Sequence, residues 1–148
     1  MKTEEEDLTL LSVKDAVTAL ERGVCSSERL IESCLAKIKT NNGKINSFIH
    51  VEAEQATSDA VQSDNRRKNG TLLSPLDGVP LAVKDNIDIL GQPTTNGLGI
   101  RWMPSKDAAI VRLLRNKGMI LLGKTNMHEA FLTHKLSSSH LLFHTPLG

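Results

Sequence analysis

Residues 78–88, Gly-Val-Pro-Leu-Ala-Val-Lys-Asp-Asn-Ile-Asp, carry an apolar run directly into a lysine and an Asp-Asn pair. The apolar residues 81–83 are typical of a short buried strand, which places Lys84 where that strand gives way to a loop. Burying an unpaired ammonium is costly, so such a lysine pairs with a carboxylate or loses its charge. Two interpretations are open: Lys84 pairs with Asp85 or Asp88, or it is a base.

Two amphipathic helices are predicted before this stretch. Ser12 is typical of an N-cap, with an acid three residues later, and Gly23 ends the first helix. Ser26 or Ser27 begins the second helix, which is predicted to end at Asn-Asn-Gly, residues 41–43. Its apolar stripe has helical spacing and consists of Leu30, Ile31, Cys34, Leu35 and Ile38.

A short extended segment at 45–51 and an alanine-rich helix at 52–65 follow. The basic residues 65–70, Asn-Arg-Arg-Lys-Asn-Gly, close that helix. Cations suit a helix C-terminus, so we interpret this cluster as a solvated helix end rather than a binding patch.

Beyond the central stretch, residues 91–99 are rich in Gly, Thr and Pro and predict a loop that faces a site. Asp107 is predicted to cap a helix, and residues 119–122 are typical of a buried strand. Strand, helix and strand in this order indicate an α/β fold with a mixed β-sheet flanked by helices. The predicted inner face of the helix is Ala109, Ile110, Leu113 and Leu114.

Composition sets limits on function. The chain has 148 residues, 39% of them apolar, which suffices for one domain with a core. A formal net charge of +1 gives no electrostatic support for direct binding to nucleic acid. No apolar run approaches the length of a membrane span, and the two cysteines are expected to be reduced. We therefore expect a cytoplasmic protein without a membrane partner.

Residues 118–125, Gly-Met-Ile-Leu-Leu-Gly-Lys-Thr, satisfy the phosphate-loop pattern. A phosphate loop needs an open, amide-lined turn between its glycines. The four residues between these glycines are apolar and favour burial as a strand. Nucleotide binding is kept only as the weaker alternative.

Two groups of residues near the C-terminus could carry other chemistry. Among the histidines, only His140 and His144 are four residues apart, the spacing that places two metal ligands on one helix face, and their segment has weak helical signals. No metal site is therefore expected from the group His128, Glu129, His134, His140 and His144. Three consecutive serines could offer a nucleophile, but no glycine lies within eight residues of them to help form an oxyanion hole. They are interpreted as part of a polar tail: Ser137, Ser138 and Ser139.

Four motifs in one order resemble the first part of the amidase signature family, over about residues 8–131. They are Pro-Leu-Ala-Val-Lys-Asp-Asn-Ile-Asp at 80–88, Gly-x-Pro-Thr-Thr-x-Gly at 91–97, Asp-Ala-x-Ile-Val-x-x-Leu at 107–114 and Gly-Lys-Thr-Asn-Met-His-Glu at 123–129. The family includes general amidases and the A subunits of glutamyl-tRNA amidotransferases, and His128 is more similar to the former.

The resemblance implies hydrolysis of carboxylic amides to an acid and ammonia or an amine by a Ser–cis-Ser–Lys mechanism. Lys84 matches the lysine, which accepts the nucleophile's proton through a bridging serine, while backbone amides stabilise the oxyanion. The implied partner of full-length relatives is a small-molecule amide substrate, with no cofactor and no metal.

The chain departs from the family after residue 131. Both family serines belong to a Gly-Ser-rich signature that this sequence does not contain. We therefore expect a truncated form that lacks both catalytic serines and is inactive alone. The expected parts are an acidic tail at 1–7, the N-terminal part of an amidase domain at 8–131 and a divergent tail at 132–148. The alternative is a non-catalytic interaction fragment that self-associates through an uncovered sheet.

Overall fold

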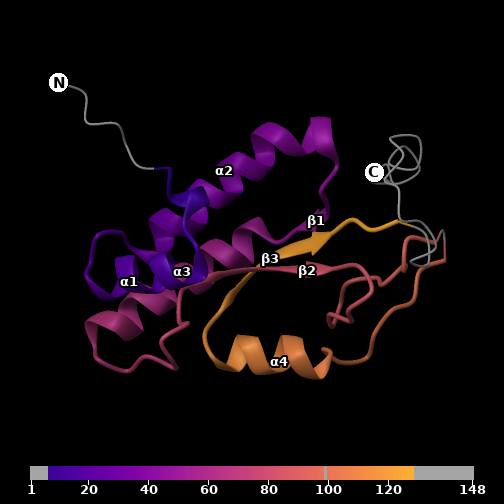
Figure 1. The fold of residues 1–148 in the computed structure, drawn as a ribbon. Helices are drawn as coiled ribbons and strands as arrows, with labels where there is room; N and C mark the ends of the chain where they lie inside the picture. Colours follow the sequence, from indigo (N-terminus) through magenta and orange to yellow (C-terminus); the bar gives the residue numbers. More distant parts are fainter. Residues whose placement is uncertain (1–6, 99, 129–148) are drawn as a thin grey trace.

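The computed structural model describes residues 7–98 and 100–128, which form an α/β fold (Figure 1). Helices predominate before residue 70, and a strand, a helix and a further strand follow it. The elements in chain order are η1 (Leu8–Leu10), α1 (Val13–Glu21), α2 (Ser27–Ile45), β1 (Phe48–Val51), α3 (Ala53–Lys68), β2 (Pro80–Lys84), α4 (Ala109–Asn116) and β3 (Ile120–Thr125).

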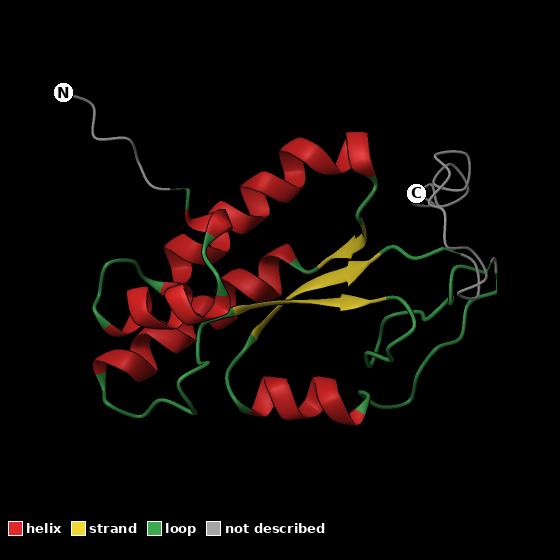
Figure 2. Cartoon of the chain, in the orientation of Figure 1, coloured by secondary structure: helices red, strands yellow, loops and turns green. Residues whose placement is uncertain are grey.

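The three strands form a mixed sheet in the order β1-β3-β2. β3 runs parallel to β2 and antiparallel to β1. The predicted strand–helix–strand unit is confirmed as β2-α4-β3. Helices α1, α2 and α3 lie to one side of the sheet and α4 lies to the other (Figure 2). Both helical layers pack against the sheet, whose central strand is β3.

Alternating residues of β3 supply the core on both sides of the sheet, as the period of two in a strand requires. Leu121 packs toward α4, whereas its neighbours Ile120 and Leu122 pack toward α2 and α3. The cluster on the α4 side contains Val83, Ile89, Val111 and Leu121. The cluster on the other side contains Ile31, Ala56, Ala60, Ile120 and Leu122.

A bulge at Leu122 and Gly123 interrupts this alternation. Leu81 pairs with Leu121, but Ala82 pairs with Gly123, so β3 carries one additional residue. A side chain at Gly123 would bring its Cβ within 2.0 Å of the His50 carbonyl oxygen, and the residue has φ of +149°. Only glycine fits there. After the bulge, Lys124 pairs with Val83 and shares its face of the sheet.

Helix α2 does not end at residues 41–43, so that prediction was wrong. The helix continues to Ile45 and ends at Asn46, which adopts the left-handed conformation with φ of 47°. The Asn42 side chain hydrogen-bonds to the first residue of β1. Its Oδ1 accepts from the Phe48 amide at 2.7 Å, and its Nδ2 donates to the Phe48 carbonyl oxygen at 2.8 Å. The amide side chain that suggested a stop therefore joins the helix to the strand.

Helix α4 differs from the prediction in its cap and its inner face. Asp107 does not cap it; the carboxylate accepts from the Leu90 amide at 2.8 Å and pairs with Arg115 at 3.2 Å. The buried residue is Val111, and Leu114, three positions on, is half-buried. The remaining residues predicted to face inward are exposed: Ala109, Ile110 and Leu113.

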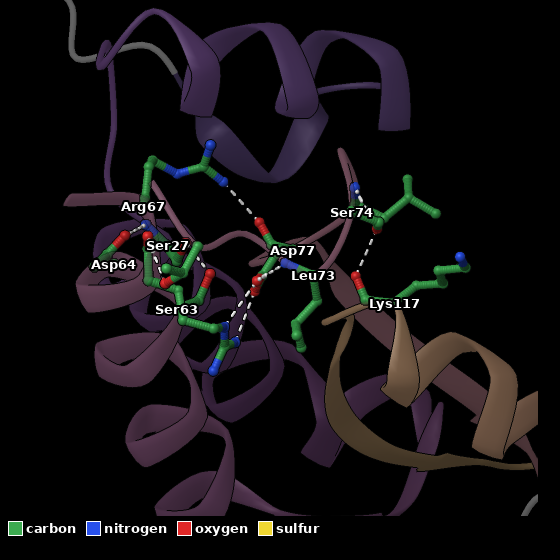
Figure 3. Close-up of polar contacts among 11 residues, drawn as sticks. Ser27, Ser63, Asp64, Arg67, Leu73, Ser74, Asp77 and Lys117 are labelled. Atoms are coloured by element: carbon green, nitrogen blue, oxygen red, sulfur yellow. Dashed lines mark hydrogen bonds and ion pairs between the residues drawn. The ribbon is translucent and has the colours of Figure 1, made fainter. Parts of the chain in front are cut away.

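The interpretation of residues 65–70 as a solvated helix end was wrong for its two arginines (Figure 3). Arg66 donates two bonds, at 2.8 and 2.7 Å, to the fully buried carboxylate of Asp77. Arg67 donates to the Asp77 carbonyl oxygen at 2.7 Å. The turn before β2 buries a carboxylate, which must be paired, and these arginines lie within reach at the end of α3.

The pKa of Asp77 lies below its usual value. Burial opposes ionisation, but hydrogen bonds from Arg66, the Leu73 amide and Ser63 outweigh that effect. A lowered folded-state pKa stabilises the fold above the unfolded-state pKa, about 3.9 for aspartate, and this contribution is lost as the pH falls through the folded-state value.

We predict that Asp77→Asn lowers the free energy of unfolding by about 2 kcal/mol at pH 7. The difference from the wild type should shrink as the pH falls below about 4, because the wild-type carboxyl then takes up a proton. Urea unfolding at pH 7, 5 and 3 measures both effects. Glu32→Gln, at an exposed site on α2, is the control and should change stability by less than about 0.5 kcal/mol. A difference independent of pH would contradict the assignment.

Candidate active site

The carboxyl ends of β2 and β3 lie at the same edge of the sheet because the two strands are parallel. Ligands of α/β sheets commonly bind outside such an edge. Lys84 is the last residue of β2 and pairs with Thr125, the last residue of β3. The prediction that Lys84 lies at the end of a strand is confirmed. A turn follows at once, in which the Ile87 amide donates to the Lys84 carbonyl oxygen at 3.0 Å.

The residue after Lys84 is a buried carboxylate. Asp85 is 1% exposed, and its ion pair is with Lys124, at 3.3 Å between Oδ1 and Nζ. The same carboxylate accepts from the amide of Thr95 at 3.2 Å and from the hydroxyl of Thr95. The Gly97 amide lies 3.5 Å from Oδ2. Asp85 therefore joins the predicted loop, which begins near residue 91, to the sheet.

Lys124 is the residue that sequence reasoning missed. Its side chain is 1% exposed, and Nζ donates to the Pro93 carbonyl oxygen at 2.9 Å and to Thr94 Oγ1 at 2.8 Å. Burial lowers the pKa of this ammonium, while Asp85 opposes the shift. The available signal was a lysine one residue beyond the predicted buried strand at 119–122, separated from it only by Gly123.

The loop that begins near residue 91 is fastened to the sheet at several points, which confirms that it is a loop beside the strand ends. Gln92, 4% exposed, donates to Glu52, the residue between β1 and α3. Thr94 and Trp102 exchange backbone hydrogen bonds at 2.8 and 2.9 Å. These contacts, together with those to Asp85 and Lys124, give the loop a defined position at this edge of the sheet.

The phosphate-loop alternative is wrong in its geometry. Residues 120–125 form β3, so no open turn lies between Gly118 and Gly123. The amine of Lys124 is buried against Asp85, where it cannot reach a phosphate in solvent.

The other site candidates lie mostly beyond the described residues. His128 is the last residue that the structure describes. The remaining candidates lie outside the described residues: Glu129, His134, His140, His144, Ser137, Ser138 and Ser139. Within 7–98 and 100–128, no three His, Cys, Asp or Glu side chains group closely enough to hold a metal ion. No helix in the same part of the chain is long and apolar enough to span a membrane.

We predict that Lys124→Met and Asp85→Asn each lower the free energy of unfolding by about 3–5 kcal/mol, because each leaves a buried charge without its partner. The double variant should lose less than the sum of the two, with a coupling energy of about 1–3 kcal/mol. Urea unfolding of the four proteins measures this.

Lys106→Met, at an exposed lysine, is the control for this cycle and should be close to neutral. Additive losses in the Asp85 and Lys124 variants would show that the two side chains do not depend on each other.

Comparisons with known proteins extend this geometry. The chain is 41% identical over 125 residues to the A subunit of the glutamyl-tRNA(Gln) amidotransferase of Salinispora tropica, and the match covers 83% of this chain and 26% of the relative. Its fold is similar to that of the peptide amidase from Stenotrophomonas maltophilia, with a TM-score of 0.72, 31% identity, and coverage of 80% of this chain and 25% of the amidase.

The chain spans about a quarter of the length of these two relatives. A bacterial aryl acylamidase of the amidase signature enzymes shares the fold, with a TM-score of 0.70, 21% identity, and coverage of 81% of this chain and 26% of that enzyme. The Amidase family model matches residues 29–145. The motifs, the fold and these matches agree, and the chain belongs to the amidase signature family.

Proposed function

We propose that this chain is the lysine-bearing part of a carboxylic-amide hydrolase and that Lys84 is its base. The observation that carries the proposal is the position of Lys84. It ends β2 beside the end of β3, at the edge of a parallel strand pair, within the residues that match the family. A lysine at such an edge can reach a reacting group held outside the strands.

In the proposed reaction, a serine hydroxyl attacks the amide carbonyl carbon while its proton passes through a second serine to Lys84 Nζ. The C–N bond then breaks, and the leaving nitrogen departs with a proton as ammonia or an amine. Water hydrolyses the acyl-enzyme ester and releases the acid. Lys84 must be neutral to accept the first proton. No metal or cofactor takes part in these steps.

Neither serine role is assigned to a residue of this chain, because the Gly-Ser-rich signature is not in its sequence. We therefore propose that the 148-residue chain does not hydrolyse amides by itself. The similarity to a peptide amidase and to an amidotransferase suggests a carboxylic amide as the substrate class.

A second candidate function is association without catalysis. Large apolar side chains are exposed on α4 and on the loop before it: Trp102 at 64%, Ile110 at 48% and Leu113 at 53%. Exposed apolar groups of this kind occur at contacts between proteins, and self-association of the chain would cover them.

The test is a graft in which residues 1–128 replace the matching part of the Stenotrophomonas maltophilia peptide amidase. Lys84→Ala in this graft should abolish hydrolysis of a peptide amide, with a loss of at least about 1,000-fold in kcat, because residues that act as a unit fail together. Ammonia release measures the rate.

Lys106→Ala in the same graft, which removes an exposed lysine, should leave kcat within about twofold of the parent. Hydrolysis that survives Lys84→Ala would remove Lys84 from the mechanism.

The 148-residue chain alone should neither release ammonia nor react with a serine-directed covalent probe; labelling or turnover would overturn the proposal that it is inactive.

A further inference from the structure

We propose that Asp85 and Lys124, together with Thr95, are positioning residues that fix the direction of Lys84 and join it to the loop at 93–97. This inference rests on the proposed role of Lys84. It goes beyond that role because it assigns a purpose to a buried ion pair whose members do not themselves take part in the proton transfer.

The Lys84 side chain leaves β2 on the face opposite to Lys124, because Lys124 pairs with Val83, the residue before Lys84. Consecutive residues of a strand alternate between the two faces, and β2 ends at Lys84. The Asp85 amide continues the strand pairing by donating to the Thr125 carbonyl oxygen at 3.0 Å. Asp85 begins the turn after the strand, and its carboxylate is held by Lys124, so the ion pair fixes the backbone from which the Lys84 side chain departs to the other face.

The turn after Lys84 is anchored through the Asp85 side chain. The Lys84 carbonyl oxygen accepts from the Ile87 amide at 3.0 Å, in a turn whose second residue is Asp85. Holding the carboxylate therefore fixes the turn that follows Lys84. If the carboxylate were released, that turn could relax and the direction of Lys84 would change with it.

The bulge in β3 makes Lys124 available as an anchor. The bulge at Gly123 shifts the register of β3 by one residue and pairs Lys124 with Val83, on the side of the sheet where Asp85 lies. Without that bulge, Lys124 would fall on the opposite face. Gly123 thus supplies the backbone conformation that the bulge needs, and Lys124 directly follows it.

The same ion pair connects the loop to Lys84. Thr95 offers two donors, its amide and its hydroxyl, to Asp85, and Thr94 and Pro93 accept from Lys124. One buried pair therefore holds both the loop and the end of β2. Buried ion pairs contribute little net stability compared with an apolar pair of similar size, so a role in fixing geometry accounts better for its position.

The test measures the reactivity of Lys84 in the 148-residue chain itself, without any enzymatic assay. The chain is treated with an amine-reactive acylating reagent, and the rate of modification of Lys84 relative to Lys106 is obtained by peptide mapping. Thr95→Val, which removes one hydroxyl, should raise this ratio by about tenfold, because loss of a hydrogen bond to a charged group favours local opening.

Two matched variants separate positioning from general stability. Thr95→Ser keeps the hydroxyl and should restore the wild-type ratio to within about twofold. Asp77→Asn destabilises the fold through a carboxylate that precedes β2, with partners other than those of Asp85, and should leave the ratio unchanged while the chain remains folded. Lys124→Met releases Asp85 from the other side and should raise the ratio as Thr95→Val does.

An unchanged ratio in folded Thr95→Val and Lys124→Met would overturn the inference. An equal rise in Asp77→Asn would also overturn it, because the effect would then follow stability alone. These outcomes are independent of the graft: retained hydrolysis in Lys84→Ala would refute the proposed function, whereas the ratio reports only how Lys84 is held.

Discussion

A buried ammonium group must be paired, and the end of this sheet is arranged around the pairing of Lys124. Its side chain is 1% exposed, and its amine is surrounded by the Asp85 carboxylate, the Thr94 hydroxyl and the Pro93 carbonyl. Removing such a charge from water without partners costs several kcal/mol, on the order of 5 or more. The loop beside β2 supplies two of the three partners, so its path follows from the same requirement.

Strand β2 lies between two buried carboxylates. Asp77 precedes it and pairs with Arg66 of α3, and Asp85 follows it and pairs with Lys124 of β3. The first pair joins the strand to the helical layer, and the second joins it to β3 and, through Thr94 and Thr95, to the loop. Residues at both ends of β2 are therefore fixed by long-range contacts. Lys84, between Asp85 and the last apolar residue of the strand, takes its place from this arrangement.

Local patterns in the sequence predicted the parts of the fold that depend on near neighbours. The cap at Ser12, the strand before Lys84 and the strand–helix–strand unit were confirmed. Long-range pairs, such as Asp85 with Lys124, were not predicted, because spacing along the chain does not show which buried acid meets which base. For the same reason, the arginines at the end of α3 were interpreted as solvated, since spacing along the chain does not show that they meet Asp77. The predicted inner face of α4 was wrong for a related reason. Four apolar residues fit a helical stripe, but tertiary packing buries Val111 instead.

The central claim, that Lys124 is a buried ammonium paired with Asp85, is tested most directly by NMR of the chain with ¹⁵N-labelled lysine. We predict one lysine Nζ signal, absent in Lys124→Met, that remains charged at pH 7, exchanges its protons slowly with water and shifts in Asp85→Asn. A Lys124 signal that exchanges as fast as those of exposed lysines, or that is unaffected by Asp85→Asn, would contradict this claim.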